Sequence, residues 1–99
     1  MITITAIIRA KAGREDALGD ALADVARHVA ENEPETVGFF IGRDLDDPAI
    51  FTTFERFTDS AAKDAHNGCD AVAAFFERAT PLIDGDVILR TCTEVSAKP

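Results

Sequence analysis

The order in which two hydrophobic periods follow one another is the feature of this chain that most constrains its fold. Residues 1–10 show the two-residue alternation of a β-strand, with apolar side chains at every second position: Ile2, Ile4, Ala6 and Ile8. Residues 14–31 show the period of an amphipathic helix, whose apolar face carries Leu18, Leu22, Val25 and Val29. The chain therefore begins with a strand and a helix that can cover it.

Two further strand patterns occupy the middle of the chain. Residues 37–43 alternate Val, Phe and Ile with Gly and Phe, and residues 50–57 are rich in Ile, Phe and Thr, which favour strands. Between them, residues 44–48 are dense in turn-forming Asp and Pro. The sequence predicts an antiparallel hairpin.

A second helical region and a last strand complete the pattern. Three N-capping side chains precede a short helix expected over residues 61–66, which Asn67 and Gly68 end. A second helical piece is expected over 71–83, and residues 87–95 predict the last strand.

The order strand, helix, strand, strand, helix, strand predicts an α+β fold. Its arrangement is the ferredoxin-like βαββαβ sandwich, a four-stranded antiparallel sheet with helices on one face. The second face of such a sheet needs a cover, which makes a homodimer plausible. We expect one domain over residues 1–95 and a C-terminal tail over 96–99.

Composition excludes several classes of partner. A formal charge of −8 argues against nucleic acid and anionic lipid, since binding to these depends on Lys and Arg. No apolar stretch is long enough to span a membrane and no signal peptide is evident, so we expect a cytoplasmic protein. Two cysteines and two histidines without ligand spacing predict reduced thiols and no metal site. No glycine-rich phosphate loop follows a strand, so no cofactor is expected.

Two polar residues stand out as candidates for chemistry. His66 can exchange a proton near neutral pH, although it could equally cap the break at Asn67-Gly68 or face water. Glu55 lies mid-strand among aromatic residues, where a carboxylate needs a partner. That partner could be an arginine such as Arg90 or Arg43 across the sheet, or a residue of a dimer partner. Alternatively, Glu55 could serve as a polar group of a pocket.

The aromatic residues are seven phenylalanines, with no Tyr or Trp. Most are expected in the core, and some are expected to line an apolar pocket for a small hydrophobic or aromatic molecule. The pocket candidates are Phe39, Phe54, Phe57, Phe75 and Phe76.

Short segments spread along nearly the whole chain match a known family in order and spacing. They are residues 9–15, residues 42–48, the runs Phe54–Phe57 and Asp64–His66, and the pairs Ala74-Phe75 and Pro81-Leu82. In these the chain resembles the antibiotic biosynthesis monooxygenase family of dimeric α/β barrels. The resemblance implies that fold and a homodimer.

Departures from the family's branches narrow the function that the resemblance implies. Members that oxidise anthrones carry Asn, Trp and Tyr where this chain has Thr53, Phe57 and Lys63, and haem-degrading members differ at Phe76 and His66.

The chain resembles the remaining, quinol-monooxygenase-like subgroup in one pattern. This subgroup has a Glu two residues before an aromatic residue and an Ala-His pair nine residues after that aromatic residue. Glu55, Phe57 and His66 occupy these positions here. This resemblance implies a cofactor-independent monooxygenase that oxidises a quinol or related phenolic or polycyclic molecule, with His66 as proton acceptor. Two alternatives stay open. One is an isomerase of a small hydroxy-ketone or lactone that also uses Glu55, and the other is a non-catalytic protein that binds a hydrophobic metabolite.

Overall fold

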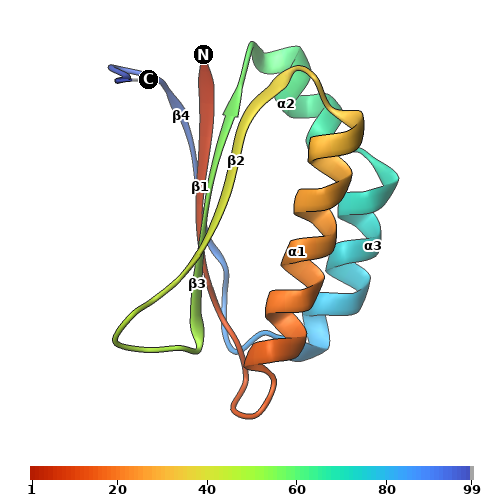
Figure 1. The fold of residues 1–99 in the computed structure, drawn as a ribbon, viewed down its shortest axis with the longest axis vertical. Helices are drawn as coiled ribbons and strands as arrows, with labels where there is room; N and C mark the ends of the chain where they lie inside the picture. The colour runs from red at the N-terminus through yellow and green to blue at the C-terminus, as the bar shows by residue number, and fades with distance from the viewer. Residues whose placement is uncertain (99) are drawn as a thin grey trace.

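The computed structural model describes residues 1–98, so position 99, the end of the predicted tail, lies outside the described residues. The predicted order of strands and helices is confirmed (Figure 1). The elements are β1 (Ile2–Arg9), α1 (Glu15–Asn32), β2 (Thr36–Arg43), β3 (Ile50–Phe57), α2 (Ser60–Asn67), α3 (Asp70–Ala79), the 3₁₀-helix η1 (Thr80–Leu82) and β4 (Ile88–Thr93).

The four strands form one antiparallel sheet in the order β2-β3-β1-β4. Helices α1, α2 and α3 all lie on one side of it, as Figure 1 shows. This is the ferredoxin-like α+β arrangement expected from the sequence. The two central strands, β1 and β3, pair along their whole length, from Ile2 opposite Phe57 to Arg9 opposite Ile50.

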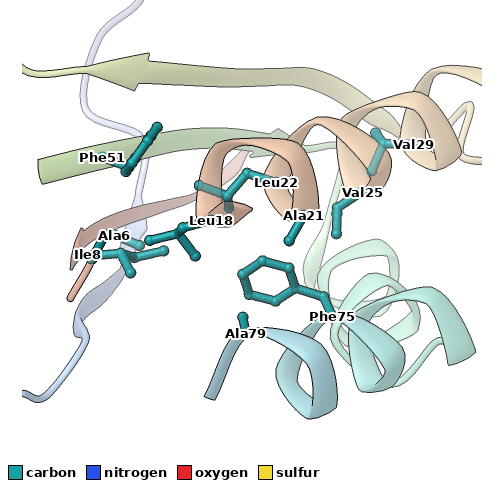
Figure 2. Close-up of a cluster of buried hydrophobic side chains, with 11 residues drawn as sticks. Ala6, Ile8, Leu18, Ala21, Leu22, Val25, Val29, Phe51, Phe75 and Ala79 are labelled. Carbon is teal, nitrogen blue, oxygen red and sulfur yellow. The ribbon is translucent and has the colours of Figure 1, made fainter. Parts of the chain in front are cut away.

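The hydrophobic core lies between the sheet and the helices (Figure 2). Because strand side chains alternate, Ala6 and Ile8 of β1 and Phe51 of β3 point toward the helices. The apolar face of α1 meets them, and α3 adds Phe75 and Ala79. An ion pair of 2.6 Å between Arg78 and Asp24 also joins α3 to α1 at the surface.

Local signals fix the ends of the helices. Gly13 precedes α1 with a φ of +82°, a conformation that other residues rarely adopt, and Pro34 follows the helix. Asp59 caps α2 by accepting a hydrogen bond of 2.8 Å from the backbone N–H of Ala62. Gly68 then ends α2, which fixes the break before α3.

The predicted turn chemistry of the β2–β3 connection is also confirmed. The Asp44 carboxylate accepts hydrogen bonds from the backbone N–H groups of Asp46 and Asp47 at 3.1 and 2.8 Å. Asp47 in turn pairs with Arg9 at 2.8 Å, which ties the loop to β1.

Three predicted elements are longer than the elements that the structure has. The first strand, predicted over residues 1–10, covers Ile2–Arg9. The second helical piece, expected to run to Ile83, leaves the α-helix at Ala79, because Pro81 enters a 3₁₀ turn. The last strand covers only Ile88–Thr93, the stretch that pairs with β1. Among residues 1–98 no helix is long and apolar enough to cross a membrane. The cytoplasmic location stays a prediction.

Candidate functional site

A cavity of about 70 Å³ opens between the helices and the sheet. Its walls are mostly apolar, and its only ionisable side chains are Glu55 from β3 and His66 from α2. The remaining lining residues are Ile4, Ala6, Ile8, Leu22, Val25, Phe39, Thr53, Asn67, Val72, Phe75, Phe76, Val87 and Leu89. Phe76 and Leu89 are each 46% exposed, so the mouth lies between α3 and β4. An apolar hollow with a few convergent polar groups is the usual form of a small-molecule site.

His66 is held between two carboxylates. Its Nδ1 lies 2.8 Å from Oε1 of Glu33, and its Nε2 lies 3.2 Å from Oε1 of Glu55. The ring packs against those of Phe39 and Phe57, with centroid separations of 5.6 and 5.4 Å. Only 5% of His66 is exposed, so the imidazole is fixed in place by both polar and aromatic contacts.

The environment of His66 favours its charged form. Burial by itself lowers the pKa of the imidazole, but the interactions with Glu55 and Glu33 together raise it by more. The pKa of His66 therefore lies above its ordinary value of 6.5. Each ring nitrogen of His66 already faces a carboxylate oxygen. Within the Glu55–His66 pair, the lone pairs that can still accept a proton are therefore those of the Glu55 carboxylate.

Glu55 is 7% exposed and is held from two sides. Its Oε2 accepts a hydrogen bond of 2.8 Å from the hydroxyl of Thr53, two residues earlier on the same face of β3, while Oε1 faces His66. Within residues 1–98 every buried side-chain nitrogen and oxygen has a partner. The candidates Glu55 and His66 are thus brought together, as one polar unit in the cavity wall.

The prediction that Glu55 pairs with Arg90 or Arg43 is wrong. Arg90 pairs with Thr5 in the register of β1 and β4, which puts it on the opposite face of the sheet. Arg43 instead reaches Asp16 at 3.2 Å and lies over the ring of Phe51. Strand alternation excludes the first pairing, and the competing contacts of Arg43 exclude the second.

Sequence reasoning missed Glu33, the C-cap residue of α1. Besides His66, its Oε1 accepts a hydrogen bond of 2.8 Å from the Thr36 hydroxyl. No local pattern signals this role, because Glu33 and His66 are 33 residues apart and meet only when α2 folds over the end of α1.

The five predicted pocket phenylalanines separate into three groups. Phe39, Phe75 and Phe76 line the cavity. Phe57 is completely buried, and its ring packs against the ring of His66. Phe54 lies on the other face of the sheet, because it stands between Thr53 and Glu55, which both face the helices. There it is 45% exposed and packs beside Phe40.

Comparison with protein families gives one match. Residues 1–78 match the family model described as antibiotic biosynthesis monooxygenase. No curated protein is significantly similar to the chain.

Solved structures match over nearly the full length. A protein of unknown function from Nitrosomonas europaea is 28% identical with a TM-score of 0.86, covering 99% of this chain and 92% of the other. A protein from Shewanella oneidensis is also 28% identical, with a TM-score of 0.84 and coverage of 92% and 87%. An antibiotic biosynthesis monooxygenase at 19% identity has a TM-score of 0.87 and coverage of 97% and 100%, which shows the shared fold.

Proposed function

Because this chain belongs to the antibiotic biosynthesis monooxygenase family, we propose that it is a cofactor-independent monooxygenase that oxidises a quinol or related phenolic molecule with dioxygen. The observation that carries the proposal is the Glu55–His66 pair in the wall of an otherwise apolar cavity. A phenol needs a base to become an electron-rich anion, and a dry aromatic cavity protects that anion from water.

Glu55 is the first proton acceptor in this proposal. The sequence predicts that His66 plays this role, but both nitrogens of His66 are already paired with carboxylates. Glu55 therefore takes the phenolic proton, and the neighbouring imidazolium stabilises the phenolate through its positive charge. His66 acts with Glu55 as one proton-holding pair.

The overall reaction balances without a cofactor. One quinol and one O₂ give one hydroxyquinone and one water. The quinol anion transfers an electron to O₂, the two radicals combine to form a C–O bond, and the O–O bond then breaks. One oxygen atom stays on the ring and the other leaves as water, with the proton returned from the Glu55–His66 pair.

Cavity size limits the substrate. The volume of about 70 Å³ is roughly half that of the ~150 Å³ cavity that holds benzene in an engineered protein. The cavity holds the reacting ring only if the half-exposed Phe76 at the mouth moves outward. This favours quinols with one or two rings over larger polycycles.

A homodimer is the second part of the proposal. The sheet face away from the helices exposes Ile7, Phe40, Phe54 and Ile88 by 40 to 62%. Together they form an apolar patch, here called the outer patch, of the kind that usually marks a protein contact. A second copy of the chain, offering the same patch, fits the isologous symmetry of most dimers.

The test uses protein stripped of metal and flavin and a panel of reduced benzoquinols and naphthoquinols. We expect O₂ uptake equal to the quinol consumed and formation of hydroxyquinone, without the hydrogen peroxide that simple autoxidation releases. Glu55→Gln should lower the rate at least about 100-fold, within the range of a general base. Glu77→Gln, a matched change on the exposed face of α3, should not alter it.

Two results would redirect the proposal. Rates that are identical in the parent and in Glu55→Gln would remove the pair from the mechanism. A substrate that is converted at the same rate without oxygen would favour the isomerase, because that reaction moves protons within one molecule and consumes no O₂.

A further inference from the structure

A second polar cluster lies behind His66, on the side away from the cavity. It consists of His28 near the end of α1, Glu33 at its C-cap and Cys69 in the break between α2 and α3. One ligand atom from each residue, namely a ring nitrogen, a carboxylate oxygen and the thiol sulfur, lies within 4.8 Å of the others. All three side chains border a surface hollow that His66 also lines.

We propose that His28, Glu33 and Cys69 form a binding site for a zinc ion. Imidazole, carboxylate and thiolate are the three ligand types that zinc takes in proteins. The charges of one carboxylate and one thiolate balance the two positive charges of the ion.

Distances in the cluster are close to those of a tetrahedral site. Bond lengths of about 2.0 Å to nitrogen and oxygen and about 2.3 Å to sulfur place two ligands about 3.3 Å apart for N and O and about 3.5 Å apart for O and S. Nε2 of His28 lies 3.3 Å from Oε2 of Glu33, and Sγ of Cys69 lies 3.9 Å from the same oxygen. The remaining pair, the His28 nitrogen and the Cys69 sulfur, lies within 4.8 Å, so the site closes when the Cys69 side chain moves toward the other two ligands.

Neighbouring residues already orient two of the ligands. Thr36 and His66 both occupy Oε1 of Glu33, which leaves Oε2 to face the cluster. Asn32 lies 3.3 Å from Nδ1 of His28, which leaves Nε2 as the nitrogen that faces Glu33. Such supporting contacts are usual around metal ligands.

Access and charge also suit a cation. The three side chains are only partly buried and border the hollow, so a fourth position is open to water, as in zinc sites with three protein ligands. The net charge of −8 attracts cations to the surface in general. The oxidation proposed above does not pass through this ion, so the two proposals stand or fall separately.

Sequence spacing could not reveal this cluster. His28 and Glu33 are five residues apart, but Cys69 lies 36 residues beyond Glu33 and joins them only through the packing of α2 against the end of α1.

Titration of the reduced, chelator-treated protein with Co²⁺ and Zn²⁺ tests the site. We expect one Co²⁺ per chain with a thiolate-to-cobalt charge-transfer band, displacement of that Co²⁺ by Zn²⁺, and release of protons on binding. Cys69→Ser should remove the band, and His28→Ala should weaken zinc binding at least about 100-fold. Cys92→Ser, which changes the other free cysteine on the outer face of β4, should keep both.

Circular dichroism with chelator present checks that each variant folds, and His28→Gln and Cys69→Ala replace any that does not. The proposal is overturned if zinc binds no tighter than about 0.1 mM. It is also overturned if tight binding or the cobalt band survives the loss of Cys69 and His28.

Discussion

His66 is the residue on which most of the candidate site depends. Each of its ring nitrogens lies near a carboxylate, and the rings of Phe39 and Phe57 pack against the imidazole. The side chains of Glu33 and Glu55 are only 13% and 9% exposed, so neither carboxylate has much water to stabilise its charge. We therefore expect the imidazole to stabilise the fold as well as to take part in the proposed proton transfer.

Replacement of His66 by Leu should cost about 3 kcal/mol in the free energy of unfolding, because it leaves two buried carboxylates without their cation. Urea unfolding monitored by circular dichroism, with chelator present, measures the loss. His28→Leu is the matched control: this side chain is 32% exposed and pairs with the same Glu33, and its loss should cost less than about 1 kcal/mol. Equal losses in both variants would contradict the central role of His66.

At the scale of elements, an ion pair on the outer face of the sheet connects β3 to the end of β4 across β1. Arg56 of β3 makes two contacts of 2.9 Å with Glu94, the residue after β4. Buried Thr3 of β1 stands opposite Arg56 in β3 and opposite Cys92 in β4, two residues before Glu94. The hydrogen bonds from Arg56 lower the pKa of Glu94 below its ordinary 4.5.

This pair should make stability depend on pH in the acid range. A carboxyl group with a lowered folded-state pKa stabilises the fold fully above pH 4.5, and the contribution disappears as the pH falls through the folded-state value. The melting temperature of Arg56→Gln should thus lie below that of the parent at pH 7 and approach it in strong acid. Arg90→Gln should show no such convergence, because within residues 1–98 the Arg90 guanidinium hydrogen-bonds only to the Leu89 carbonyl. A gap for Arg56→Gln that stays constant down to pH 3 would refute the assignment.

Element order was largely predictable because it depends on local periodicity. The strand over residues 50–57 matches the prediction, and the helix expected over 14–31 is displaced by one residue at each end. The site was less predictable. Glu55 and His66 are visible in the sequence, but their pairing with each other and with Glu33 depends on contacts between distant segments. The placement of Phe54 required the register of the sheet, which no residue type indicates alone.

The whole molecule divides into two faces with different chemistry. The helix side encloses the core and the Glu55–His66 cavity, whereas the other side of the sheet carries the outer patch. If two such sheets packed together through the outer patch, the patch would be buried. Each cavity would then be formed by residues of one chain alone.

Phe54→Asp places a charge in the outer patch and should convert the proposed dimer to a monomer, as measured by light scattering after size-exclusion chromatography. Phe76→Asp is the matched control, since Phe76 is as exposed as Phe54 but lies on the helix side of the sheet. It should leave the oligomeric state unchanged. A parent protein that is monomeric at all concentrations, or a Phe54→Asp variant that stays dimeric, would contradict the proposed interface.

Transfer of the substrate proton to the Glu55–His66 pair is the central claim, and it can be observed before any oxygen reacts. The quinol for this measurement is one that the protein oxidises in the O₂-uptake panel. Rapid anaerobic mixing with it should produce the absorption band of the quinol anion in the parent protein and not in Glu55→Gln. An anion band of equal size and rate in both proteins would contradict the claim.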